Sequence, residues 1–316
     1  MIPYATAAEV EAALGRAMTW AEAMWFRYSA AMPDYWLYCH TFVIVLLVYT
    51  IAPLPLLLFE SFAPGVVLPY KLQPRVRSLP PAASFRCYIN TACKLTFSVG
   101  PLVLVSYPAT VKIMGIQMGL PLPSFREIAT QLLVYALVDD YLNYWIHRFL
   151  HTKWGYTWIH HVHHEFTTPI GFSSTYAHWA DILIVTIPAL VGVAIVPCHI
   201  AVQWLWFSIR LIGDIDKHSG YNFPFSPDKI IPFYGGAEFH DYHHYIGGHS
   251  QGNFASFFTH CDYIYGTDKG YKYHKARLAK MVLILNALVT AQTKGLSGAT
   301  SGENVFGPLV DLPSVG

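Results

Sequence analysis

The chain has 316 residues, of which 54% are hydrophobic and only 12% are charged. Soluble domains average about 25% charged residues, so this composition indicates a membrane protein. The net charge of +1 excludes the broad basic surface of nucleic-acid-binding proteins, and we expect no nucleic-acid partner. Five cysteines without a C-x-x-C pair indicate neither a disulfide framework nor a zinc ribbon.

Residues 1–38 are predicted to form an N-terminal helix in the membrane interface. Between positions 7 and 29, apolar side chains recur at helical spacing and charged ones occupy other positions. The segment is not a signal peptide, because no basic start, apolar centre and small-residue cleavage site follow one another in it.

Residues 39–124 are predicted to contain the membrane anchor helices. The stretch 40–59 has no acid and no fixed cation, and about 20 such residues cross a bilayer core. Pro53 and Pro55 should kink its end. A second apolar run, 95–116, contains two prolines and either spans or is re-entrant. The basic, acid-free stretch between the runs predicts a cytosolic loop.

The next predicted helix, 126–147, carries a stripe of polar side chains. Asp140, Tyr144, His147 and His151 are spaced by four, three and four residues and therefore share one face. We expect Asp140 to orient a metal-ligating imidazole through the nitrogen that does not bind the metal. The alternative is a solvent-exposed carboxylate at the helix end, which is the expectation for Asp139.

Residues 182–209 carry no formal charge and are divided by Pro188 and Pro197. The prolines favour two short helices that form a hairpin. Beyond them, residues 219–275 are polar, aromatic and rich in turn signals, as expected of a cap on a metal site. Residues 276–316 are predicted to form a C-terminal helix followed by a disordered tail rich in glycine, serine and proline.

Histidines gather in three boxes: an H-x-x-x-H and two copies of H-x-x-H-H. Residues three or four apart lie on one helix face, so we expect each set to point at one spot and all three to form one site. A ninth candidate ligand, His218, ends an apolar segment between the second and third boxes. His161 is less suited as a ligand, because it lies about 100° around a helix from His160. The predicted ligands are His147, His151, His160, His163, His164, His218, His240, His243 and His244.

This inventory predicts two metal ions. Neutral imidazole is the commonest metal ligand, whereas so many imidazoles without a metal would repel one another on protonation. One ion takes about four ligands at a structural site and about three at a catalytic one, so each ion would keep an open position. Four histidines that lie apart from the boxes, His40, His199, His260 and His274, are expected to be ordinary surface or interfacial residues. We therefore predict an all-α membrane protein with about four transmembrane or re-entrant helices and a cytosolic helical cap that carries a histidine-rich dimetal site.

These residues carry a resemblance to a known family. The boxes, IDKHSGY, IHHVHHEFTTPIG and NFASFFTHCDYIYGTDKGY resemble the fatty acid hydroxylase superfamily of membrane-bound diiron enzymes, and within it the plant-type sterol 4α-methyl oxidases. The similarity covers the predicted catalytic domain, residues 125–275. The family usually shows AHP followed by glutamate two positions on, where this chain has His178, Trp179, Ala180 and Asp181, so the resemblance assigns no role to His178 or Asp181.

The resemblance implies a function. It implies an oxygen-dependent monooxygenase with two non-heme iron ions that oxidises the 4α-methyl group of 4,4-dimethyl or 4α-methyl sterol precursors. The sequence has no nucleotide-binding motif, and the resemblance implies that electrons come from NAD(P)H through a reductase and cytochrome b5. It also implies a multi-pass endoplasmic reticulum protein with a cytosolic catalytic face, for which other C4-demethylation enzymes are candidate partners.

Other functions fit some of these features. A sterol C5-desaturase or a fatty acyl or sphingolipid hydroxylase would share the boxes, because pocket geometry decides between the outcomes. A histidine-rich zinc transporter would need polar groups along a path through the membrane. The apolar run 182–209 contains only His199, and the histidines cluster at segment ends, which disfavours transport.

Overall fold

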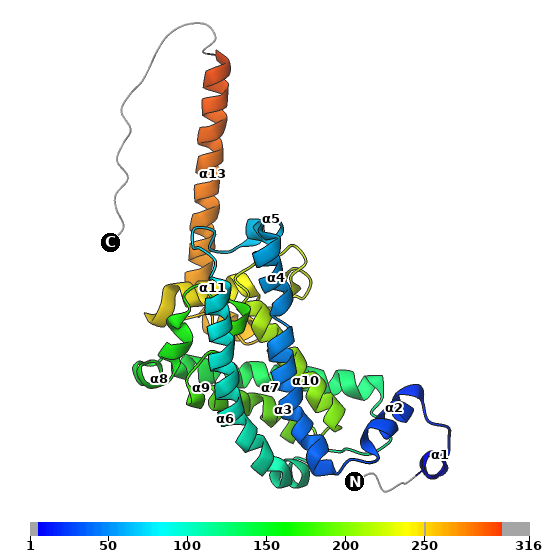
Figure 1. The fold of residues 1–316 in the computed structure, drawn as a ribbon. Helices are drawn as coiled ribbons and strands as arrows, with labels where there is room; N and C mark the ends of the chain where they lie inside the picture. The colour runs from blue at the N-terminus through cyan, green and yellow to red at the C-terminus, as the bar shows by residue number, and fades with distance from the viewer. Residues whose placement is uncertain (1–5, 250, 299–316) are drawn as a thin grey trace. The chain divides into compact units, whose positions relative to one another are not determined.

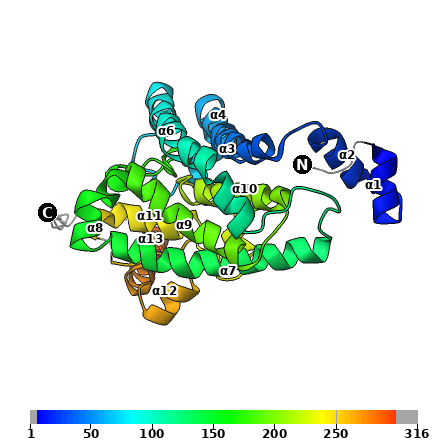
Figure 2. The same ribbon diagram turned by 90° about the horizontal axis from the view of Figure 1, so that it is seen from below.

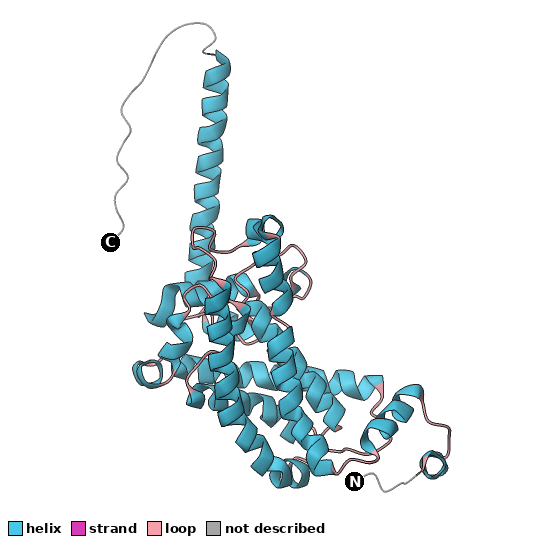
Figure 3. Cartoon of the chain, in the orientation of Figure 1, coloured by secondary structure: helices cyan, strands magenta, loops and turns pink. Residues whose placement is uncertain are grey.

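The computed structural model describes residues 6–249 and 251–298, and within these ranges it contains helices and no strand (Figure 3). The predicted all-α class is confirmed. The chain divides into two compact units, one ending at Asp268 and one beginning at Lys269. The second unit contains the helix α13 (Lys269–Gly298), which starts before the predicted residue 276, and the predicted disordered tail lies outside the described residues.

The elements of the first unit follow one another in two stretches. The N-terminal stretch contains α1 (Ala7–Leu14), α2 (Trp20–Ser29), α3 (Asp34–Ile51), α4 (Leu54–Phe62), α5 (Pro64–Val67), the short 3-10 helix η1 (Leu68–Tyr70) and α6 (Pro81–Ile113). The second stretch contains α7 (Phe125–Leu150), α8 (Lys153–Trp158), η2 (His160–Glu165), η3 (Gly171–Ser173), α9 (Trp179–Ile195), α10 (Ile200–Lys217), η4 (Pro227–Lys229), α11 (Ala237–Ile246), η5 (Gly247–His249) and α12 (His260–Tyr265).

The N-terminal region forms two helices where one was predicted. Gly15 ends α1 in the left-handed conformation, with φ +66°, which other residues adopt rarely. Thr19 then begins α2 with a capping box: its hydroxyl accepts from the backbone N–H of Glu22, and the Glu22 carboxylate accepts from the N–H of Thr19. An ion pair of 2.8 Å between Arg16 and Glu22 fixes the linker.

In the part of the chain that the structure describes, two helical segments are long and apolar enough to cross a membrane, namely 34–62 and 81–113. The first is α3 followed by α4, broken next to Pro53 as predicted, and the second is α6, which keeps two prolines within it. Helix α3 packs along both α6 and α10 (Figure 1). Among the described residues α9 is a shorter apolar helix, about 26 Å long, so two of the four expected membrane helices reach spanning length.

Residues 182–209, the run without formal charge, lie in α9 and α10, which form a pair of helices as predicted. The break falls at Pro197, whereas Pro188 lies inside α9. Trp206 and Arg210 on α10 donate side-chain hydrogen bonds of 3.2 and 2.6 Å to backbone carbonyls of α9. These bonds fold the two helices back on each other.

The longest helix of the second stretch, α7, lies beside α9 (Figure 2). Gly192 makes this close approach feasible, because a Cβ there would lie 3.0 Å from the Cα of Tyr135. Tyr135 is fully buried and donates a 2.6 Å hydrogen bond to the carbonyl of Val196 at the end of α9. The packing fixes α7, whose C-terminal end carries the first histidine box.

Candidate metal centre

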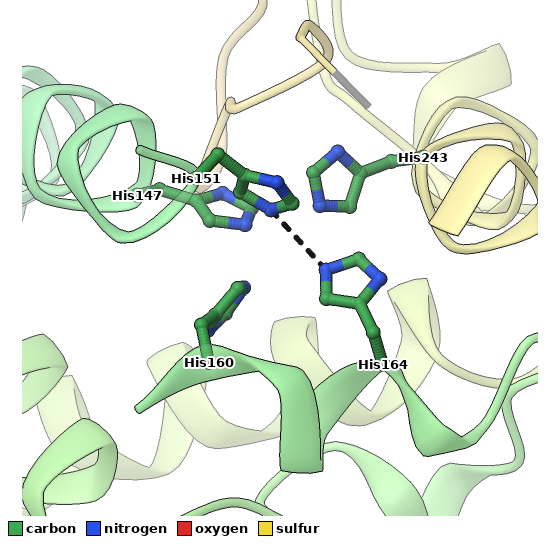
Figure 4. Close-up of side chains that lie close together, drawn as sticks. All are labelled: His147, His151, His160, His164 and His243. Carbon is green, nitrogen blue, oxygen red and sulfur yellow. Dashed lines mark hydrogen bonds between the residues drawn. The ribbon is translucent and has the colours of Figure 1, made fainter. Parts of the chain in front are cut away.

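The structure brings all nine predicted ligands together in two groups. Within each group, one potential ligand atom of every residue lies within 4.8 Å of the others. Figure 4 shows the rings of the first group arranged around a common centre. The first group is His147, His151, His160, His164 and His243, and the second is His163, His218, His240 and His244.

Each H-x-x-H-H box contributes to both groups, which corrects the expectation that one box points at one spot. Histidines four residues apart stay together, whereas His163 and His243, the fourth positions of the two boxes, join the opposite group. Neighbouring residues diverge by about 100° on an α-helix and about 120° on a 3-10 helix such as η2, so adjacent histidines must face different centres. The pairs that stay together are His147 with His151, His160 with His164, and His240 with His244.

The distances between ring nitrogens suit shared metal ions. Two imidazoles bound to one ion at about 2.1 Å place their nitrogens about 3.0–3.4 Å apart. The Nε2 atom of His218 lies 3.2 Å from Nε2 of His163 and 2.9 Å from Nε2 of His240. In the first group, the Nε2 atoms of His151 and His164 are 3.2 Å apart.

The protonation of His163 and His218 argues for a cation between them. Nδ1 of His163 lies 3.2 Å from the carbonyl of Tyr176, and Nδ1 of His218 lies 2.8 Å from the carbonyl of Asp214. A carbonyl only accepts hydrogen bonds, so each Nδ1 carries the ring proton and each Nε2 presents a lone pair. The two lone pairs face each other, an arrangement that a bound cation would stabilise.

Three further ligand candidates are held by backbone carbonyls in the same way. Each ring donates a hydrogen bond of 2.8–3.1 Å from Nδ1 to a backbone carbonyl: His147 to that of Phe254, His243 to that of Gly252 and His244 to that of Phe166. Such bonds from the outer nitrogen fix the tautomer and the orientation of a metal-binding ring. The histidine groups are therefore preorganised by the loops 166–176 and 252–254.

Burial keeps these rings neutral. Removal from water, with a smaller effect from His218, lowers the pKa of His163 to about 3. Burial likewise lowers the pKa of His243 to about 3 and that of His244 well below its ordinary value. Neutral imidazole is the form that binds metals, so the site is ready to bind ions at neutral pH.

Asp140 does not have the role that the sequence predicted. Its Oδ1 accepts from the backbone N–H groups of Phe257 and Phe258 at 2.7 and 2.9 Å, and its Oδ2 lies 3.2 Å from Nδ1 of His260. It contacts none of the nine predicted ligands in this way, because two helical turns, about 10 Å, separate it from His147. Asp140 instead anchors the loop that follows Phe254.

Asp139, expected in solvent, is fully buried. Its carboxylate accepts from Nε of Arg210 at 2.9 Å and from the hydroxyl of Ser256 at 3.2 Å. The expectation was wrong because α10 brings a cation against this part of α7, a tertiary contact that helix periodicity does not report.

Asp181, to which the sequence assigned no role, orients a histidine. Its Oδ2 lies 2.7 Å from Nδ1 of His160, and both side chains are buried. Nε2 of His160 is left buried without a hydrogen-bond partner, as expected of a nitrogen that awaits a metal. His178 caps α9 through a 3.3 Å bond from the N–H of Ala180. No spacing rule links Asp181 to His160, since the contact depends on how α9 enters the fold.

The other histidines lie outside the two groups. His161, which was less suited as a ligand, is exposed, whereas His199 is buried and hydrogen-bonds to the carbonyl of Gly119 at 3.0 Å. His260, expected to be an ordinary residue, meets Asp140 and Cys261 within 4.8 Å in a third, smaller group. These side chains adjoin the loop that Asp140 anchors.

An apolar cavity of about 350 Å³ opens beside the histidines and is lined by α3, α6, α7, α9 and α10. Two cations in its wall are each matched by an acid: Arg210 pairs with Asp139 at 2.9 Å, and Lys217 lies 3.4 Å from Asp214. Each cation in the wall is thus paired with an acid, and the mostly apolar remainder suits an uncharged, mostly hydrocarbon molecule. The histidines that line it are His147, His160, His163, His218 and His240.

Comparison with known proteins gives the chain its relatives. Residues 132–267 match the profile of the family described as fatty acid hydroxylase. The chain is 59% identical over 302 residues to the very-long-chain aldehyde decarbonylase GL1-10 of Oryza sativa subsp. japonica, covering 96% of this chain and 98% of that protein. It is 53% identical over 283 residues to methylsterol monooxygenase 1-2 of Arabidopsis thaliana, covering 89% and 94%. Methylsterol monooxygenase 2-2 of the same plant is 42% identical over 226 residues, covering 71% and 83%. No solved structure matches the chain.

Proposed function

The chain belongs to the fatty acid hydroxylase family, and from this membership we propose that it is a membrane-bound, metal-dependent monooxygenase that oxidises the 4α-methyl group of a sterol precursor. The observation that carries the proposal is the pair of facing lone pairs on His163 and His218, which both line an apolar cavity. The similarity to methylsterol monooxygenases over about nine-tenths of the chain supports the sterol substrate.

The nine histidines would hold two iron ions, one in each group. Bound iron would supply the redox chemistry that activates oxygen, which zinc lacks. One round consumes O₂, two electrons and two protons and converts a methyl C–H bond into C–OH with release of water. By family resemblance, further rounds lead toward the carboxylate that a separate enzyme removes. The protein's own part is to bind the substrate in the apolar cavity and to exclude water from the site.

The electron supply completes the proposal. The resemblance supports cytochrome b5 as donor, reduced by an NAD(P)H-dependent reductase, and a cytosolic catalytic face on the endoplasmic reticulum membrane. Other C4-demethylation enzymes are the proposed neighbours, because the oxidised product must pass to a decarboxylating step. The two spanning-length helices, α3 with α4 and α6, support attachment to the bilayer.

A second candidate substrate is a very-long-chain aldehyde. The decarbonylase relative, at 59% identity, supports it, and a linear chain also suits an apolar cavity. The two substrates differ in the position of their oxygen. In a 4-methylsterol the hydroxyl group sits on the carbon next to the one that bears the methyl group, whereas the aldehyde oxygen sits on the reacting carbon itself.

The proposal is tested by purifying the full chain anaerobically in detergent, loading it with iron and supplying a reduced electron donor. We expect mass spectrometry to detect hydroxymethyl and then carboxyl products from a 4,4-dimethylsterol, with oxygen consumed. Conversion of a long-chain aldehyde to an alkane with no sterol product would replace the sterol proposal by the second candidate.

A further inference from the structure

Several polar side chains in the cavity wall have unmet hydrogen bonds, and two of them, Asn143 and Ser174, are connected to the histidine groups. Asn143 is 6% exposed and Ser174 is 5% exposed, and both line the cavity. Neither Nδ2 of Asn143 nor Oγ of Ser174 has a hydrogen-bond partner. A buried polar group without a partner costs free energy, so such groups in a ligand cavity indicate a polar atom on the ligand.

Both residues lie close to the histidine groups. Asn143 precedes His147 by four residues on α7, so both side chains project from one face of the helix. Ser174 lies two residues before Tyr176. The carbonyl of Tyr176 accepts a hydrogen bond from Nδ1 of His163. Asn143 is thus connected to the first group and Ser174 to the second, and both line the same cavity as the histidines.

The rest of the cavity is long and mainly apolar. Gln203 and His218 both line it and lie on or directly after α10, separated by about 22 Å along the helix axis. Phe42, Val99 and Leu102 are among the apolar side chains of the anchor helices in the wall. Gln203 also carries an unpartnered oxygen, but it lies far from His218. A molecule whose polar group neighbours its reacting carbon would therefore place that group at Asn143 and Ser174.

We infer that Asn143 and Ser174 form a hydroxyl-binding subsite that recognises the 3-hydroxyl group of a sterol. The inference rests on the proposed function and deepens it. The amide N–H of Asn143 would donate to the hydroxyl oxygen, and the hydroxyl hydrogen would be donated to Oγ of Ser174. Because carbon 3 is bonded to carbon 4, these two bonds hold the methyl group on carbon 4 against the histidines.

The subsite also explains how the site distinguishes its candidate substrates. A linear aldehyde carries no hydroxyl group on the carbon next to its reacting carbon, and it would leave both side chains unsatisfied. A site built to hydrogen-bond a substrate hydroxyl rejects analogues that lack it much more strongly than a hydrophobic pocket rejects a missing methylene. Asn143 and Ser174 are therefore specificity-determining positioning residues.

The test compares a 4α-methylsterol with its 3-deoxy analogue, using full-length protein in detergent. Binding is measured on zinc-substituted protein, and turnover on iron-loaded protein with a reduced donor. For the natural chain we expect the 3-deoxy compound to bind about tenfold more weakly or worse. Asn143→Leu and Ser174→Ala should each reduce this ratio to about threefold or less, chiefly by weakening binding of the 3-hydroxy compound.

Two further variants sharpen the test. Gln203→Leu removes another unpartnered polar side chain from the same cavity, about 22 Å along α10 from His218, and should leave the ratio unchanged. Ser174→Thr keeps the hydroxyl group and should keep the ratio. Metal content and helicity by circular dichroism establish that each variant is folded, and Ser174→Ala carries the test if Asn143→Leu does not fold.

The outcomes separate this inference from the proposed function. If the natural chain oxidises the 3-hydroxysterol while both Asn143→Leu and Ser174→Ala keep the full ratio, the subsite is wrong and the function stands. If the natural chain neither binds nor oxidises any methylsterol, the proposed function fails and the inference fails with it.

Discussion

The carboxylate of Asp181, at the start of α9, lies 2.7 Å from Nδ1 of His160 in η2. This contact links the helix that packs along α7 to a member of the first histidine group. A carboxylate bonded to the outer nitrogen raises the basicity of the ring and fixes Nε2 toward the metal.

Replacing Asp181 should therefore weaken metal binding before it affects folding. We expect Asp181→Asn to lower the affinity for iron by about 10–100-fold, because an amide can no longer balance the developing charge on His160. Iron retained during titration with a chelator measures the effect. Glu165→Gln, which alters an exposed carboxylate at the end of η2, is the matched control and should bind iron normally. Equal iron affinity in the two variants would reduce Asp181 to a structural residue.

The second histidine box offers an internal control for the ligands. His163→Ala removes a buried member of the second group, whereas His161→Ala changes an exposed neighbour two positions away. We expect the first variant to lose iron and turnover together while its circular dichroism spectrum stays helical, and the second to match the natural chain. Full iron content in His163→Ala would contradict the assignment of this group.

The stability of the metal-free protein should depend on pH. Burial lowers the pKa of His163 and of His243 to about 3 in the fold, against about 6.5 for an unfolded chain. Between these values the unfolded chain binds more protons, so the free energy of unfolding is highest above pH 6.5 and decreases as the pH falls. At about pH 5.5 each such histidine should lower the free energy of unfolding by roughly 1 kcal/mol relative to its value above pH 6.5.

Thermal unfolding of chelator-treated protein at about pH 7.5 and about pH 5.5 measures this dependence. The midpoint should be lower at the acidic pH, and His163→Ala should show a smaller difference between the two conditions. A midpoint that does not change with pH would mean that the histidines are not buried without charge in the metal-free fold.

Asp140 should matter for stability and not for metal binding. Its Oδ1 accepts hydrogen bonds from the backbone N–H groups of Phe257 and Phe258. Asp140→Ala would leave both donors without this partner, the first of them buried. We expect a loss of about 1–3 kcal/mol in the free energy of unfolding, with iron content per folded protein unchanged. Denaturant titration and metal analysis of the same sample check both parts, and reduced iron at normal stability would restore the role expected from the sequence.

The convergence of the histidines could be predicted because it depends on local geometry. His147 and His151 are four residues apart on a helix, and the two H-x-x-H-H boxes repeat one spacing. The division of each box between two groups follows from the angle between neighbouring residues, but which group each histidine joins depends on how η2 and α11 face each other. That relation is tertiary and is not encoded in spacing.

The acids were harder to assign than the histidines. Asp139, Asp140 and Asp181 are all buried, yet their partners come from α10, from the loop after Phe254 and from η2. A helical stripe reports which side of α7 a residue occupies, but not what packs there. The N-terminal break was different, since Gly15 and the Thr19 capping box are visible in the sequence and outweigh the apolar periodicity.

Because each H-x-x-H-H box contributes histidines to both groups, the order of synthesis determines when each group is complete. A nascent chain that has emerged only as far as His218 contains four of the five members of the first group and two of the four members of the second. Neither cluster is complete until α11 has been synthesised and docked, since His243 finishes one and His240 with His244 finish the other. Both groups therefore become complete in the same step, when α11 docks, although most of the first group is already present in the unfinished chain.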